Sequence, residues 1–276
     1  MMNILMSANN EVIDGVELVL YTLLTHNKNC RIYIFTMDIE CIISDEGEVK
    51  KYVGLDPVLQ KYLTNLVHYL DNTSDIKFVD CHDVYVEHLL GNPNEIFAKW
   101  LTPYASLRLF ADIMLPNVHN ILYLDCDVAI CGNIEEMYNN CCAQDCDYAA
   151  YVCDDARYGE GEMISGVMVL NLDHIRKSGF LASARRNAKN NAYQWYDQDA
   201  IRETGVKPYH ISEQYAYMHD LNNLVELPKI IHFTNELSPK VYMKDVTKEY
   251  FYRKYSFLNY VKEGTERFKT IVQFKK

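Results

Sequence analysis

Residues 121–130 constrain the fold more than any other stretch of this chain. They read Ile-Leu-Tyr-Leu-Asp-Cys-Asp-Val-Ala-Ile, and such an apolar run predicts a buried strand. Asp125 and Asp127 then lie where the strand leaves its sheet, which is where open α/β sheets bind their ligands. Neighbouring carboxylates suit Mg²⁺ or Mn²⁺. The alternative interpretation is a surface Asp-x-Asp tripeptide without a ligand.

The first half of the chain alternates strand-like and helix-like segments. Strands are expected at 3–7, 31–36, 76–79 and 121–125, and helices at 15–25, 57–70 and 100–115. Asp56 before Pro57 is a good N-cap, and Pro116 closes the last of these helices. This alternation predicts an α/β fold with a mostly parallel sheet covered by helices on both faces.

The second half is less regular. Strand-like segments occur at 148–153, 167–172 and 230–233, and helix-like segments at 173–190 and 196–203. No repeat, low-complexity tract or linker divides the chain. We therefore expect one compact domain over residues 1–276.

Composition excludes several classes of protein. The formal net charge is −11, whereas nucleic-acid binding demands a basic face. No stretch approaches the roughly 20 apolar residues of a membrane span, and no secretory signal is expected. The nine cysteines are odd in number, which favours reduced thiols over a disulfide framework. Cys141, Cys142 and Cys146 do not match the spacing of zinc ligands.

Five motifs follow one another along the chain. They are the segment from Tyr104 through Arg108 to Pro116, the Asp125-Cys-Asp127 strand, the strand from Ser165-Gly166 to Asn171, the triplet Asp197-Gln198-Asp199, and His232 in His-Phe-Thr-Asn. In this order they resemble the motifs of the family 8 glycosyltransferases, which are retaining, metal-dependent enzymes of GT-A fold. The resemblance covers about residues 3–240. It implies a GT-A (nucleotide-diphospho-sugar transferase) fold with a mostly parallel central sheet.

The resemblance also implies an activity and a set of site residues. A UDP-sugar would donate glucose or galactose to a glycan, a lipid-linked sugar or a protein. Asp125, Asp127 and His232 would bind Mn²⁺ (or Mg²⁺), since mixed oxygen and nitrogen donors favour Mn²⁺ over Ca²⁺. Gln198 and Asp197 would be the catalytic residues. The donor-binding residues would be Ser7, Ala8, Asn9, Arg108, Asp125, Cys126, Asp154, Ser165, Gly166, Asp197 and Lys240.

In this interpretation residues 1–130 form the nucleotide-binding half and residues 131–243 the sugar and acceptor half. Residues 244–276 form a C-terminal helical segment. The expected location is the cytoplasm, including the inner face of its membrane, with at most peripheral membrane contact and no nucleic-acid partner. The acceptor and the oligomeric state stay open.

Three positions depart from the family pattern. Val12 stands near the place of the aromatic residue that stacks on the base, and Ile164 replaces the usual Asn before Ser165-Gly166. Lys240, the candidate diphosphate clamp, lies two residues later than expected.

Several alternatives remain open at this level. Arg108 could form an ion pair with Asp112 one turn on, and His232 could be an ordinary core histidine. Asp154, with Asp155, could belong to a solvated acidic loop. The whole chain could be a nucleotide-sugar-binding protein without turnover. It could also be a haloacid-dehalogenase-like phosphatase in which Asp125 is the nucleophile.

Overall fold

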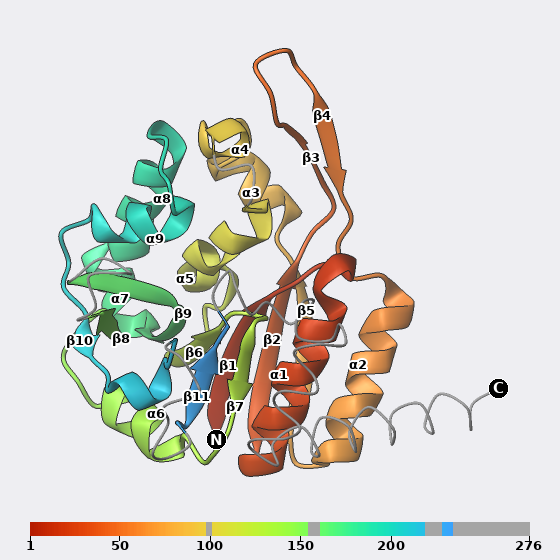
Figure 1. Ribbon diagram of the computed structural model, residues 1–276, viewed down its shortest axis with the longest axis vertical. Coiled ribbons are helices and arrows are strands. Elements are labelled where there is room, and N and C mark those ends of the chain that lie inside the picture. Colours follow the sequence, from red (N-terminus) through yellow and green to blue (C-terminus); the bar gives the residue numbers. More distant parts are fainter. Residues whose placement is uncertain (98–100, 154–160, 219–227, 234–276) are drawn as a thin grey trace.

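A seven-stranded sheet forms the centre of the protein, in the order β10-β8-β9-β6-β1-β2-β5 (Figure 1). The computed structural model describes residues 1–97, 101–153, 161–218 and 228–233. The strands are β1 (Met2–Ser7), β2 (Cys30–Thr36), β5 (Asp75–Asp80), β6 (Asn120–Leu124), β8 (Tyr148–Cys153), β9 (Glu162–Asn171) and β10 (Tyr209–His210). Four of the six pairings are parallel, and β9 runs antiparallel to β6 and β8. The expected mostly parallel α/β sheet is confirmed.

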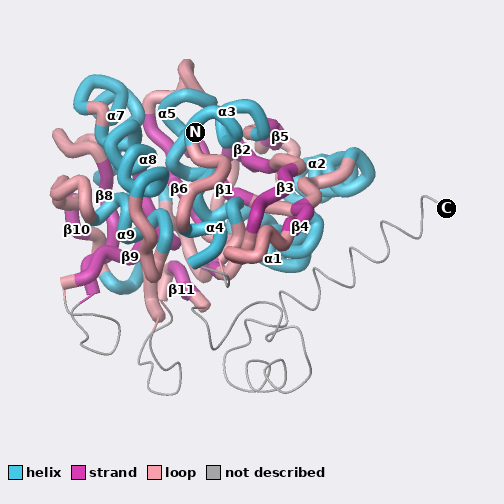
Figure 2. The backbone as a smooth tube through the Cα atoms, turned by 90° about the horizontal axis from the view of Figure 1, so that it is seen from above, coloured by secondary structure: helices cyan, strands magenta, loops and turns pink. Residues whose placement is uncertain are grey.

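Two hydrophobic cores lie on opposite faces of this sheet. Because side chains alternate along a strand, Ile4 and Met6 of β1 enter one core and Leu5 enters the other. Helices α1 (Ile13–His26), α2 (Pro57–Leu70) and α6 (Glu135–Cys142) cover the first face. The second face is covered by α3 (His82–His88), the 3₁₀ helix η2 (Pro103–Phe110), α5 (Ala111–Met114), α7 (Leu172–Ser178), α8 (Phe180–Asn190) and α9 (Tyr196–Arg202). Seen from above, β1 and β2 lie between α3 and α5 on one side and α1 on the other (Figure 2).

Two small antiparallel sheets complete the described fold. One is the hairpin of β3 (Ile39–Ile42) and β4 (Val49–Tyr52), which projects from the body after β2 (Figure 1). The other pairs β7 (Val128–Ile130) with β11 (Ile230–His232). The short elements are α4 (Asn94–Phe97), η1 (Asn10–Val12) and η3 (Glu213–Tyr215).

Two predictions of local structure were wrong in part. The segment expected as one helix at 100–115 is η2 followed by α5, and the start of that range lies outside the described residues. The helix expected at 173–190 is two helices, because Gly179 adopts a φ of 73° and ends α7. The strand expected at 121–125 is confirmed as β6, which ends at the Asp-Cys-Asp triplet, and β7 follows the turn. The hairpin β3–β4 and helices α3, α4 and α6 had no counterpart in the prediction.

Candidate functional site

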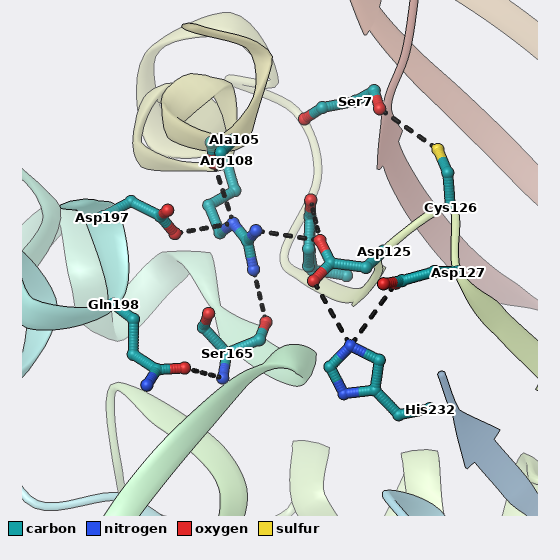
Figure 3. Close-up of polar contacts among 11 residues, drawn as sticks. Ser7, Ala105, Arg108, Asp125, Cys126, Asp127, Ser165, Asp197, Gln198 and His232 are labelled. Atoms are coloured by element: carbon teal, nitrogen blue, oxygen red, sulfur yellow. Dashed lines mark hydrogen bonds and ion pairs between the residues drawn. The ribbon is translucent and has the colours of Figure 1, made fainter. Parts of the chain in front are cut away.

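The Asp-Cys-Asp turn is held tightly between β6 and β7. The amide of Asp125 donates to the carbonyl of Gly166 at 2.9 Å, and the thiol of Cys126 donates to the carbonyl of Ser7 at 3.2 Å (Figure 3). Gly15 of α1 lies directly against this turn, since a Cβ there would come 2.2 Å from the carbonyl oxygen of Cys126. The turn is therefore fixed by backbone contacts that leave its two carboxylates free to point the same way.

Strand β11 brings His232 to these carboxylates across more than a hundred residues of sequence. In the antiparallel pairing with β7, His232 lies opposite Val128, and the amide of Phe233 donates to the carbonyl of Asp127 at 2.8 Å. Nε2 of His232 lies 3.4 Å from Oδ1 of Asp127 and 3.8 Å from Oδ2 of Asp125. Gly166 makes room for the ring, because a Cβ at that position would lie 2.2 Å from Cε1 of His232.

The chemistry of this cluster fits a divalent cation. One donor atom from each of Asp125, Asp127 and His232 lies within 4.8 Å of the others. Both separations from Nε2 are longer than an ordinary hydrogen bond, and Oδ1 of Asp127 is buried without a hydrogen bond among the described residues. Buried polar atoms left in this way call for an explanation such as a bound ion. Mixed carboxylate and imidazole donors suit Mn²⁺.

Charge within the cluster shifts its pKa values in opposite directions. Burial by itself would raise the pKa of Asp125, but the neighbouring Arg108 and His232 outweigh it and hold that pKa below its usual value. Burial would lower the pKa of His232, yet the carboxylates of Asp127 and Asp125 raise it overall. The two carboxylates therefore favour positive charge at the position of the His232 ring.

Arg108 connects the residues of the neighbouring part of the site (Figure 3). It is only 4% exposed, and its guanidinium contacts Oδ1 of Asp125 at 2.8 Å through Nη2 and Oδ2 of Asp197 at 3.0 Å through Nε. It also donates to the backbone carbonyls of Ala105 and Ser165. A buried guanidinium is tolerated because it is paired and hydrogen-bonded in this way.

The interpretation of Arg108 as a partner of Asp112 is wrong. Asp112 instead forms an ion pair with Arg185 of α8, at 2.6 Å between Nη1 and Oδ1. Arg108 instead contacts the carboxylate that follows β6 and the carboxylate of Asp197 in α9.

Helix α9 presents Asp197 and Gln198 from its first turn. Burial raises the pKa of Asp197 to about 7, although Arg108 opposes the shift. The side-chain carbonyl of Gln198 accepts a hydrogen bond from the amide of Ser165 at 3.0 Å. Asp197 and Ser165 thus both contact Arg108, and Gln198 joins them through Ser165.

Other predicted residues lie at the end of β1 or outside the described part of the chain. Ser7, Ala8 and Asn9 are buried, and the side chain of Asn9 caps η1 by accepting from the amide of Glu11. Asp154 and Lys240 lie outside the described residues, as does the segment 244–276.

Tyr123 was missed by sequence reasoning. Its hydroxyl donates to Oδ1 of Asp125 at 2.6 Å, and its ring lies 3.9 Å from the guanidinium carbon of Arg108. The available signal was its position two residues before Asp125, which places both side chains on the same side of an extended strand.

The sequence matches a known protein family over most of its length. The model of the family described as "Glycosyl transferase family 8" matches residues 3–249. No curated protein matches the sequence. Among the described residues, no helix combines the length and apolar character that crossing a membrane requires.

Several solved structures share the fold at low sequence identity. The galactosyltransferase LgtC in complex with donor and acceptor sugar analogs aligns with a TM-score of 0.67 and 13% identity, over 96% of both chains. Mouse xyloside xylosyltransferase 1 aligns with a TM-score of 0.61 and 13% identity, over 85% of this chain and 98% of its own. The glycosyltransferase GlyE of Streptococcus pneumoniae aligns with a TM-score of 0.57 and 16% identity, over 86% of this chain and 55% of its own.

Proposed function

Because this chain belongs to glycosyl transferase family 8 and is a glycosyltransferase of GT-A fold, we propose that it transfers glucose or galactose from a UDP-sugar. The acceptor would be a hydroxyl of a glycan, a lipid-linked sugar or a protein, and the product would keep the anomeric configuration of the donor. Residues 1–130 would bind the nucleotide, and residues 131–243 would bind the sugar and the acceptor. Family membership favours this activity over the phosphatase interpretation.

One observation carries the proposal. Asp125 belongs to two adjoining clusters at once, with Oδ1 paired to Arg108 and Oδ2 facing His232. The cation ligands thus lie beside the buried guanidinium, Asp197 and Gln198. A sugar diphosphate has both the charged groups and the hydroxyls that such a site can bind.

The metal cluster would act on the diphosphate end of the donor. Asp125, Asp127 and His232 would hold Mn²⁺ or Mg²⁺, with Mn²⁺ favoured by the imidazole ligand. A cation bound there would offset the negative charge that develops on the departing nucleoside diphosphate. Because the protein carries a net charge of −11, an anionic donor depends on such local positive charge. Lys240 is proposed as a further contact to the diphosphate.

The Arg108 cluster would act on the sugar end. Asp197 can accept hydrogen bonds from sugar hydroxyls while Arg108 holds its carboxylate in place. Gln198 is neutral and a poor nucleophile, whereas double displacement needs a carboxylate close to the anomeric carbon. We therefore assign Gln198 to stabilising the developing positive charge while the acceptor attacks from the leaving-group side. Ser7, Ala8, Asn9, Cys126, Asp154, Ser165 and Gly166 would complete the donor site.

A screen of nucleotide sugars without acceptor tests this function. Mn²⁺-dependent release of UDP from UDP-glucose or UDP-galactose is expected, and calorimetric titration should show that UDP binds more tightly when Mn²⁺ is present. NMR of the early product reads its anomeric configuration. Tight UDP binding with no turnover of any sugar would instead indicate a binding protein, and full activity in EDTA would contradict the metal assignment.

A further inference from the structure

Tyr196, the residue before Asp197, has an unusual backbone conformation. Its φ is 37°, and among the described residues only Asn29 is another non-glycine with a positive φ. A residue with a Cβ disfavours this region, so contacts with its surroundings must hold it there. Because Asp197 and Gln198 follow directly, the conformation of Tyr196 sets the direction in which both side chains leave the backbone.

The ring of Tyr196 lies in the core, but its hydroxyl does not fix this conformation. Tyr196 is 2% exposed and belongs to the core on the second face of the sheet. Its hydroxyl is buried without a hydrogen bond among the described residues. The hydrogen bonds that hold the turn must therefore be made by its neighbours in the chain.

Asp199, the last member of the Asp-Gln-Asp triplet, makes such a hydrogen bond. Its Oδ2 accepts from the amide of Trp195 at 2.9 Å, and the carbonyl of Trp195 accepts from the amide of Gln198 at 2.9 Å. Trp195 is thus tied to α9 through both of its backbone groups. Asp199 is only 5% exposed, and a hydrogen bond to a carboxylate is stronger than one between neutral groups. The side chain of Asp199 therefore closes the turn that contains Tyr196.

Arg202 connects the carboxylate of Asp199 to β9. Its Nη2 lies 3.1 Å from Oδ1 of Asp199 as an ion pair, although this oxygen makes no hydrogen bond among the described residues. Its Nη1 donates to the carboxylate of Glu162 at the start of β9. Gln198 lies one helical turn before Arg202 on the same face of α9, and its side-chain carbonyl accepts from the amide of Ser165, also in β9. Helix α9 is thus fastened to β9 at two points.

We propose that Asp199 is a positioning residue for sugar transfer. It holds the amide of Trp195 and so keeps Tyr196 in its left-handed conformation. The same turn fixes the direction of Asp197 and Gln198. The inference rests on the proposed function for its kinetic consequence, whereas its conformational part stands on the contacts of Asp199 alone.

Replacement of Asp199 by Ala tests this contact most directly. It removes the acceptor of the Trp195 amide, so kcat for release of UDP from the sugar nucleotide should fall roughly 10- to 100-fold. The affinity for UDP with Mn²⁺ should stay within about two-fold, because the cation ligands belong to other elements. Asp199→Asn keeps a side-chain oxygen that can accept from the amide, so it should retain most of the wild-type kcat. An Asn variant as impaired as the Ala variant would overturn the proposal.

NMR reads the conformational part without any turnover. The chain has two tryptophans, so protein labelled with ¹⁵N-tryptophan gives two backbone amide resonances, and Trp100→Phe identifies that of Trp195. A hydrogen bond to a carboxylate moves the resonance of an amide proton downfield. The Trp195 resonance should therefore shift upfield in Asp199→Ala and stay near its wild-type position in Asp199→Asn. An unshifted resonance in Asp199→Ala would overturn the inference.

Asp71 offers a matched control at the other non-glycine residue with a positive φ. Its Oδ2 accepts from the amide of Asn29 at 2.9 Å, and Asp71 is 8% exposed. Asn29 directly precedes β2, whereas the site lies where β1 and β6 end, so Asp71→Ala removes the same kind of contact at the opposite end of parallel strands. The resonance of Trp195 and kcat per folded molecule should stay unchanged. Equal loss of kcat in the two alanine variants would show a general effect on stability and overturn the proposal.

The kinetic and NMR measurements separate failure of the inference from failure of the proposed function. A wild type that turns over no sugar nucleotide would refute the proposed function, and the Trp195 resonance would still report whether Asp199 holds the turn. A shifted resonance with unchanged kcat would overturn the positioning role.

Discussion

The two clusters that share Asp125 differ in how closely their oppositely charged groups are paired. Around Arg108, guanidinium nitrogens lie within 3.0 Å of carboxylate oxygens of Asp125 and Asp197 and donate to two backbone carbonyls, although Oδ2 of Asp197 is buried without a hydrogen bond among the described residues. Around His232, carboxylate and imidazole atoms face one another at 3.4 and 3.8 Å. The first cluster is ordered by the protein's own charges, whereas the second has the composition and spacing of a site that a cation would complete. The difference suggests that removing a residue from the first cluster should lower stability, and removing one from the second should lower ligand binding.

The largest expected effect is in the metal cluster. Asp127→Ala should reduce transfer by about a thousand-fold or more, because a divalent cation contributes several kcal/mol of charge stabilisation. Mn²⁺-dependent UDP binding should disappear while the unfolding free energy stays the same or rises. Turnover assays and titration calorimetry measure both. Asp45→Ala, an exposed carboxylate in the hairpin turn, is the control, and a similar loss there would refute the assignment.

In the Arg108 cluster, a substitution should lower the unfolding free energy. Arg108→Met leaves the buried Asp197 and the partly exposed Asp125 without their cation, so the unfolding free energy should fall by about 3 kcal/mol. Denaturant unfolding measures the change. Arg186→Met, on the exposed face of α8, should change stability by no more than about 0.5 kcal/mol. Equal changes in the two variants would contradict the view that Arg108 holds the cluster together.

Gly166 offers a way to disturb the metal cluster without touching a ligand. Gly166→Ala places a Cβ against the ring of His232, which must move, so affinity for Mn²⁺ should fall about 10- to 100-fold. Gly132→Ala is the matched control, because its Cβ meets the flexible end of Lys229 at 2.8 Å. Calorimetry with Mn²⁺ alone compares the two. Unchanged affinity in Gly166→Ala would show that His232 is not a ligand.

Asp197→Asn tests whether the sugar and the nucleotide are held separately. Removing the charge should lower turnover efficiency by roughly ten- to a hundred-fold, since each charge-assisted hydrogen bond to a sugar hydroxyl contributes about 1.5–3 kcal/mol. UDP affinity should stay nearly constant. Asp112→Asn weakens the ion pair to Arg185 and serves as the control. If UDP binding falls as much as turnover, Asp197 supports the nucleotide site instead.

The smallest expected effect concerns Glu17, which lies outside both clusters and whose pKa is raised by burial. Burial raises the pKa of Glu17 to about 7, although Tyr62 donates to it. When folding raises the pKa of a carboxyl group, the group's full contribution to the unfolding free energy is present below about pH 4.5. That contribution is lost as the pH rises through 7. Glu17→Gln should abolish this decline, which we put at about 1–2 kcal/mol after allowing for partial exposure. Unfolding curves between pH 4 and 8 compare the variant with the wild type, and parallel pH profiles would refute the prediction.

Much of the fold could be predicted from local patterns. The helix at 57–70 and the strand at 148–153 have the bounds that the sequence predicted. A proline after a capping aspartate, or a run of apolar side chains between polar segments, sets the conformation of its own residues. The hairpin β3–β4 escaped prediction because its outer face carries the exposed side chains of Ile42 and Val49, so no clean alternation of apolar and polar residues marks it.

The sequence by itself determined the parallel sheet and the position of Asp125 and Asp127 at the end of a buried strand, since both follow from periodicity within a few residues. The sequence also matched the family motif that contains His232. Only the tertiary structure decided what these residues touch. The register of β11 on β7 brings His232 to Asp127. Arg108 forms ion pairs with Asp125 and Asp197, and not with the nearby Asp112. Pairing across long loops depends on how the whole sheet packs, and no local pattern encodes that choice.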